Sequence, residues 1–242
     1  MSRVYVPAHF AMTDEDAAEV LATAGAADLI TSHADGLAAT PLPFVYDPSI
    51  GPRGALLGHV ARVNPQWSSP SVGEALVLVR ATDHYVSPSW LPSTREHGRV
   101  VPTWDYVAVH VYGELLAHDD AAWTLDVVTR LTGRHEAGRP EAWSIEDPPE
   151  GYVSAMLRAI VGIEVRITRW VAKAKMAQNK TPADVAALAT ALADSADADG
   201  AVWVREHSLP AAQQFGGDRL HGVRVRVGAE LGEVADPPGD QG

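Results

Sequence analysis

A strict two-residue alternation between positions 106 and 112 is the pattern that most limits how this 242-residue chain can fold. Valines occupy the odd positions, whereas aromatic residues, an alanine and a histidine occupy the even ones: Tyr106, Val107, Ala108, Val109, His110, Val111 and Tyr112. Successive side chains of a β-strand point to opposite faces of a sheet. The stretch 106–116 is therefore predicted to be a strand with one buried aliphatic face and one aromatic, polar face.

Other short apolar runs predict further strands, and the turns between them set the chain's organisation. The Ala34-Asp35-Gly36 turn predicts a β-hairpin, and Pro41 and Pro43 place its second strand at an edge or a bulge. The predicted strands are 28–33, 37–46, 55–62, 75–81 and 163–167, and the predicted helices begin at Thr13, Asp119, Tyr152 and Thr181. Ala201–Arg205 and Gly222–Val227 are each expected to form a short strand or an arm onto a partner subunit.

Composition excludes several classes of function. The chain has 19 basic and 31 acidic residues, a net charge of −12, and no basic stripe, so direct binding to nucleic acid is not expected. It has no cysteine, so disulfides, zinc-thiolate sites, iron–sulfur clusters and a thiolate haem ligand are excluded. Without a signal sequence or an 18-residue apolar run, the protein is expected to be cytoplasmic and not to enter a membrane.

Three segments combine Trp, His, Arg, Asn or Tyr with prolines: residues 58–67, 87–92 and 101–106. Such segments offer flat stacking surfaces, cationic groups and a restricted backbone together, which is typical of a binding cleft. The sequence therefore predicts the functional site within residues 58–112.

Four ordered motifs carry a resemblance to a known family. They are G-H-x-A-R-x-N-P-Q-W from Gly58, S-P-S-W-x-P-S from Ser87, V-P-T-W-x-Y-x-x-x-H-x-Y-G from Val101 and A-K-x-K-x-x-Q-N from Ala172. In this order they resemble the PaiB family, often described as FMN-binding negative transcriptional regulators, over roughly residues 5–179. The resemblance implies a mainly β fold with flanking helices (α+β), an FMN-binding split β-barrel that forms a homodimer with cofactor clefts at the subunit interface.

The resemblance, together with the acidic, Gly- and Pro-rich composition of the last residues, predicts how the chain is divided. Residues 1–180 are expected to form the split-barrel domain, residues 181–228 a C-terminal helix and arm, and residues 229–242 a disordered acidic tail.

One branch of the family resembles the haem-dependent piperazate synthases, which close an N–N bond in N5-hydroxyornithine. This chain has Thr94 where the family usually has lysine, and Asp105 where the usual W-N-Y has asparagine. Both departures weaken the expectation of ordinary flavin phosphate binding and leave the haem branch open.

His59 is the first candidate for a haem iron ligand, because imidazole is a common protein ligand where thiolate is unavailable. The alternative is a strand histidine hydrogen-bonded in a structural turn. Arg62, Asn64 and Gln66 are expected to hold propionates, a phosphate or a substrate carboxylate; Arg62 could instead form an ion pair at a dimer seam.

Two tryptophans and two lysines complete the predicted cofactor site. Trp90 and Trp104 offer flat faces to a porphyrin or isoalloxazine, although core packing would explain them equally well. Lys173 and Lys175 are expected to bind a propionate or a phosphate with their positive charges; the alternative is that both are solvated surface charges.

The resemblance and the polar side chains of these motifs also predict which residues bind and convert a small-molecule substrate. His59, Asp105 and Thr94 are the predicted catalytic residues. Asp105 would fix a substrate ammonium or act as a base, unless it pairs with Arg95 or Arg99. The predicted substrate contacts are Ser89, Thr103, Tyr106 and His110.

Two functions follow as hypotheses. The first is a haem b enzyme that converts N5-hydroxyornithine to piperazic acid by forming an intramolecular N–N bond. The alternative is an FMN-binding PaiB-like regulatory protein without direct DNA contact, because residues 181–195 contain no Lys or Arg with which a recognition helix could bind phosphates.

Overall fold

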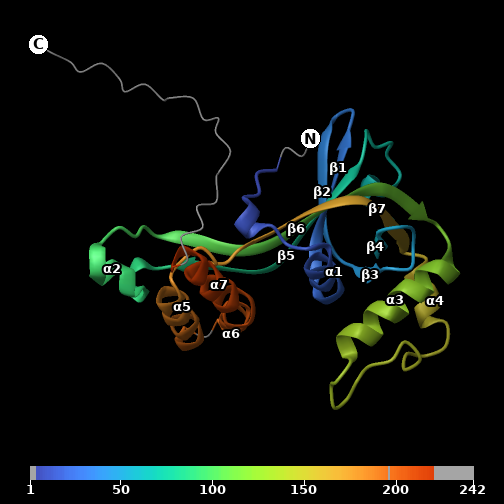
Figure 1. Ribbon diagram of the computed structural model, residues 1–242. Helices are drawn as coiled ribbons and strands as arrows, with labels where there is room; N and C mark the ends of the chain where they lie inside the picture. Colours follow the sequence, from blue (N-terminus) through green and yellow to red (C-terminus); the bar gives the residue numbers. More distant parts are fainter. Residues whose placement is uncertain (1–3, 196, 221–242) are drawn as a thin grey trace, which may run out of the picture.

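One seven-stranded sheet organises the molecule. A computed structural model describes residues 4–195 and 197–220, and its strands follow the order β2-β1-β5-β6-β7-β4-β3 with antiparallel neighbours (Figure 1). The strands are β1 (Ala26–His33), β2 (Gly36–Pro43), β3 (Val45–Asp47), β4 (Ala55–Ala61), β5 (Ala75–Val86), β6 (Thr103–His118) and β7 (Ile160–Lys175). The predicted fold class, mainly β with flanking helices, is confirmed.

The two edge strands of this sheet are consecutive in the chain, because only Phe44 separates β2 from β3. A Cβ atom added to Gly58 of β4 would lie 2.8 Å from the carbonyl oxygen of Pro43, so the end of β2 contacts β4 directly. The sheet therefore curls until its ends meet, as a split β-barrel requires. Pro41 and Pro43 lie in edge strand β2, as their missing N–H groups predict.

The alternation along β6 sorts its side chains as predicted. Val107, Val109 and Val111 are fully buried, whereas the residues between them are half-buried on the outer face. Strand β7 adds Val161, Ile163 and Val165, which are also fully buried. The two strands pair over most of their length with one register shift, between Tyr112 and Gly113.

Helices gather at both ends of the long strands (Figure 1). Near the β6–β7 connection lie α3 (Ala121–Glu136) and α4 (Tyr152–Leu157), and α3 packs on β3, β4 and β7. At the other end lie α2 (Pro92–His97), α5 (Pro182–Asp194), α6 (Ala198–Trp203), the π-helix η4 (Val204–Ser208) and α7 (Leu209–Leu220). Helix α1 (Asp14–Thr23) contacts β3 and β6, and the 3₁₀ helices are η1 (Ala8–Phe10), η2 (Pro65–Trp67) and η3 (Pro88–Trp90).

Helix starts follow the predicted capping chemistry. Thr13 and Asp16 form a capping box at α1, Asp120 accepts N–H groups at the start of α3, and Thr181 precedes Pro182 at α5. Side-chain oxygens satisfy backbone donors that the first turn of each helix would otherwise leave unpaired.

The C-terminal region departs from the sequence prediction. Ala201–Arg205 is helical, in α6 and η4, so the expectation of a strand there is wrong. The Asp197 side chain caps α6 by accepting the Gly200 N–H at 3.0 Å, and Ala201 and Val204 are buried. Local capping and packing thus outweigh the strand preference of this short apolar run. The predictions for Gly222–Val227 and for the 229–242 tail lie outside the described residues.

Gly113, at the register shift in β6, is expected to tolerate no side chain. A Cβ atom there would collide with the backbone carbonyl of Arg166 on β7, and backbone cannot move aside as a flexible side chain can. Gly113→Ala should lower the free energy of unfolding in urea by about 1–3 kcal/mol. The matched control is Gly133→Ala on the exposed face of α3, where a Cβ atom meets nothing within 4 Å. That substitution should stabilise by about 0.5–1 kcal/mol; equal effects would contradict the argument.

Candidate functional site

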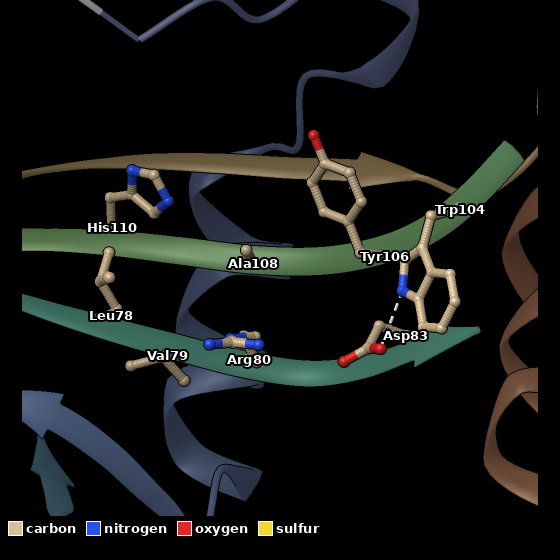
Figure 2. Close-up of a pocket in the computed structure, with 8 residues that line it drawn as sticks. All are labelled: Leu78, Val79, Arg80, Asp83, Trp104, Tyr106, Ala108 and His110. Atoms are coloured by element: carbon tan, nitrogen blue, oxygen red, sulfur yellow. Dashed lines mark hydrogen bonds between the residues drawn. The ribbon is translucent and has the colours of Figure 1, made fainter. Parts of the chain in front are cut away.

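An aromatic and cationic pocket lies on the outer face of β5 and β6, within the region that the motifs indicate. Its lining residues are Leu78, Val79, Arg80, Asp83, Trp104, Tyr106, Ala108 and His110 (Figure 2). In the close-up, the Tyr106 and His110 rings project from the same side of β6. The alternation of β6 places these side chains outside the barrel, opposite the buried valines.

A register shift between Arg80 and Asp83 shapes one wall of this pocket. Irregularities of this kind redirect side chains and are frequent beside functional sites. The Trp104 indole N–H donates to Asp83 Oδ1 at 2.8 Å, which fixes the orientation of a ring that is 53% exposed. The Arg80 guanidinium is exposed and forms no ion pair or side-chain hydrogen bond with any other described residue. It is therefore free to bind an anion.

His110 is a neutral imidazole in this pocket near pH 7. Burial, and to a smaller extent the positive charge of Lys173, lowers the pKa of His110. Lys173 Nζ lies 5.3 Å from the centre of the Tyr106 ring, over the same outer face. Within the described part of the chain, the His110 ring has no hydrogen-bond partner, so its nitrogens remain available to a ligand.

His59 lies elsewhere. On β4 it shares a face with Ala55 and Leu57, which pack against Val127 and Leu131 of α3. The ring is half-buried, its Nδ1 is buried with no partner among the described residues, and burial lowers its pKa. His59 is thus neutral with one unpaired nitrogen, as an iron ligand requires, but it does not line the outer-face pocket. Its predicted role as a ligand stays a prediction.

The other polar residues of the first motif form hydrogen bonds and an ion pair with other residues of the same chain. Arg62 makes a bidentate pair with Asp119, at 2.9 and 2.7 Å, and this hydrogen-bonded pairing lowers the pKa of Asp119. Asn64 donates to Thr40 Oγ1 at 3.0 Å. Buried Gln66 donates to the Leu29 carbonyl at 3.1 Å and accepts from Thr40 Oγ1 at 2.6 Å. These bonds fasten the end of β4 to the β1–β2 hairpin and to the β6–α3 junction.

The polar residues of the second motif form hydrogen bonds within the segment 87–94 itself. The Thr94 hydroxyl donates to the Pro88 carbonyl at 2.5 Å, and Ser89 Oγ lies 2.8 Å from Ser87 Oγ. Trp90 is partly buried against the core. None of these predicted site residues lines the outer-face pocket.

Three predicted residues meet on the inner side of the start of β6. Lys175 Nζ donates to Thr103 Oγ1 at 2.7 Å and pairs with Asp105 Oδ1 at 3.0 Å. Asp105 is 1% exposed, and burial raises its pKa while Lys175 opposes that rise. Its ion pair therefore forms with Lys175 rather than with Arg95 or Arg99.

Comparison with known proteins decides the family. A family model described as a putative FMN-binding domain matches residues 4–169. The chain belongs to this family. A Bacillus subtilis relative, protease synthase and sporulation protein PAI 2, is 28% identical over 185 residues, covering 75% of this chain and 85% of its own. An uncharacterized protein of Saccharomyces cerevisiae is 34% identical over 119 residues, covering 48% of this chain and 70% of its own.

A solved structure shows the same fold. The flavocytochrome Anf3 from Azotobacter vinelandii superposes with a TM-score of 0.52 at 13% identity, covering 72% of this chain and 74% of the other. The predicted PaiB-like family and the FMN-binding split-barrel fold are confirmed. Among the described residues of this family member, no helix has the length and apolar character to cross a bilayer.

Sequence reasoning missed the β5 side of the outer-face pocket, Leu78, Arg80 and Asp83. The run 75–81 contains enough valine and leucine to suggest a strand buried on both faces. Arg80, at the end of an alternation with Leu76 and Leu78, was the available signal that one face of this strand is open.

Removing the charge of Lys173 should raise the pKa of His110. Lys173→Met deletes the positive charge that disfavours the imidazolium but leaves most of the burial, so the pKa should move only part of the way to its ordinary value. An NMR titration of the histidine ring signals measures this shift. The control is Lys180→Met, on the turn after β7, which should leave His110 unchanged. An unchanged His110 in Lys173→Met would contradict the assigned cause.

Proposed function

We propose that this chain binds FMN in the outer-face pocket. The observation that carries the proposal is the unpaired Arg80 guanidinium in a pocket whose other side carries Trp104 and Tyr106. A guanidinium suits a phosphate, and aromatic faces suit a flat heterocycle. The family, described as a putative FMN-binding domain, supports the same ligand. The donors fit the cofactor, which when bound supplies electron and hydride transfer.

A second copy of the chain would complete this site. The pocket has a volume of about 270 Å³, which is just below the range of roughly 300–1,000 Å³ typical of small-molecule sites. Half-buried apolar side chains continue the outer face beyond Leu78 and His110, including Ile30, Leu76 and Val171. In the homodimer that we propose, the partner covers this face and excludes water from the cofactor.

A haem enzyme is the second candidate function, and the state of two histidines favours it. His59 and His110 both have lowered pKa values, and each has at least one ring nitrogen without a partner among the described residues. Neutral imidazole is the form that binds iron. The reaction would close the N–N bond of piperazic acid when the α-amine of N5-hydroxyornithine displaces the hydroxylamine oxygen, so that the N–O bond breaks and water is released. Asp105 would hold a proton beside Lys175. Thr94, whose hydroxyl donates to the Pro88 carbonyl, would position the turn between η3 and α2.

A regulatory role, if the chain has one, would act through a protein partner. The net charge is −12 and α5 contains no Lys or Arg, so contacts to DNA phosphates lack their usual donors. A role of this kind is compatible with FMN binding.

An absorbance spectrum separates the two cofactors. The protein is mixed with FMN in one sample and with haem in another, and unbound ligand is then removed. The FMN sample should retain the flavin bands at about 370 and 450 nm. A Soret band at about 400 nm would instead support the haem candidate. In that case His59→Ala and His110→Ala should be compared, because loss of the band in only one identifies the ligand. Retention of neither cofactor would contradict both candidates.

Comparing FMN with riboflavin tests the phosphate contact. Arg80→Ala should weaken FMN about tenfold or more, as expected for a lost charge-assisted bond, and leave riboflavin affinity unchanged because riboflavin lacks the phosphate. Trp104→Ala should weaken both ligands. Flavin fluorescence quenching measures each dissociation constant. Arg95→Ala, an exposed arginine on α2, is the control; equal losses of both flavins in Arg80→Ala would refute the contact.

A further inference from the structure

A second pocket lies on the opposite side of β6 from the outer-face pocket, which we name the inner-end pocket. It is bounded by η1, by the connection from α2 to β6 and by the turn after β7, and its volume is about 320 Å³. The residues used below are Phe10, Arg99, Thr103, Asp105, Lys175 and Lys180. The alternation of β6 separates the two pockets, because Thr103 and Asp105 point inward whereas Trp104 and Tyr106 point outward.

The lining of the inner-end pocket has an excess of positive charge. The lining contains three cations, Arg99, Lys175 and Lys180, and one carboxylate, Asp105, so two positive charges are in excess. Lys175 pairs with Asp105, whereas the side chains of Arg99 and Lys180 form no ion pair or hydrogen bond within the described part of the chain. The charge of Lys180 still acts at longer range on the carboxylates of Asp105 and Asp184 and favours their ionised forms. In a protein of net charge −12, two unpaired cations at one cavity are a local exception. They favour an anionic ligand.

Asp105 and Thr103 hold Lys175 in place at this pocket. Its ammonium donates to Thr103 Oγ1, to the Trp104 carbonyl and to Asp105 Oδ1, at 2.7, 2.5 and 3.0 Å. Asp105 is 1% exposed, so its carboxylate lies beneath the ammonium, away from the opening. Asp105 is thus a positioning residue here, and a ligand would meet cations first.

The turn that carries Lys180 has an unusual backbone. Ala177 has φ of 66°, the left-handed region, and it is the one non-glycine residue with positive φ in the described ranges. The Gln178 side chain accepts the Met176 N–H at 2.8 Å and donates to the Ala174 carbonyl at 2.5 Å, and the Lys180 N–H donates to the Ala177 carbonyl at 2.9 Å. Backbone held in this region by its surroundings is concentrated at ligand sites. Here it fixes Lys180 at the rim of the pocket.

We propose that the inner-end pocket binds a small anion with a carboxylate or phosphate group, held by Arg99 and Lys180. The Arg99 guanidinium suits two oxygens of one group, and Lys180, which also lines the pocket, supplies a point charge. Phe10, 9% exposed, contributes an apolar wall for a short carbon skeleton. This site is independent of the flavin proposal, because it shares no lining residue with the outer-face pocket.

Calorimetric titration of the full chain tests the proposal with two probes, inorganic phosphate and succinate, at constant ionic strength. At least one probe should bind saturably with a stoichiometry of one per chain, and the tighter probe identifies the anionic group. The double variant Arg99→Ala/Lys180→Ala should weaken it about tenfold or more. Arg95→Ala, a neighbouring exposed arginine that does not line the pocket, should leave it unchanged.

Three outcomes would overturn the proposal. They are the absence of saturable binding by either probe, an equal loss in Arg95→Ala, and binding that is lost in Arg80→Ala but kept in the double variant. The last outcome would place the anion in the outer-face pocket instead.

Circular dichroism and urea unfolding of the double variant separate a lost ligand contact from a lost fold, and Arg99→Gln alone provides a milder second variant. Any weakening by Arg99→Gln in a folded protein supports the site.

Discussion

Burial of the inward side chains of β6 and β7 is the interaction on which the rest of the molecule depends. The valines at 107, 109 and 111 of β6 and Val161, Ile163 and Val165 of β7 have no exposed surface, and each such side chain contributes about 1.5–3 kcal/mol to folding. A shift of β6 by one residue would expose its three valines, so the register is strongly determined. The same register directs Trp104 and Tyr106 outward and Thr103 and Asp105 inward, and so determines both pockets.

The motifs that identify the family serve folding at least as much as ligand binding. Gln66 joins β4 to the first hairpin, Arg62 joins it to the start of α3, and Ser93 donates its N–H and hydroxyl to buried Asp184 of α5. Each of these bonds links elements far apart in the sequence. A motif can therefore identify the fold clearly while leaving the bound ligand undetermined.

Patterns of short range predicted most of the fold. Alternation located β6, the Ala34-Asp35-Gly36 turn located the first hairpin, and capping residues located α1, α3 and α5. The pockets were only partly predictable, because they depend on which side chains converge across strands. Trp104, Tyr106 and His110 were identified, but Arg80 and Arg99 were not, since a single exposed arginine looks the same in a solvated loop. His59 is the first predicted iron ligand mainly because of the family resemblance. Helix α3, whose packing no local pattern reveals, packs against the same face of its strand.

The way the sheet closes limits how this protein can associate with others. Edge strand β3 is three residues long, and β2 contains two prolines that cannot donate backbone hydrogen bonds. An extended peptide would find few unpaired amides along which to align. Association would instead rely on the shapes and charges of side chains on the sheet faces, and it would leave the backbone hydrogen bonding of the sheet intact.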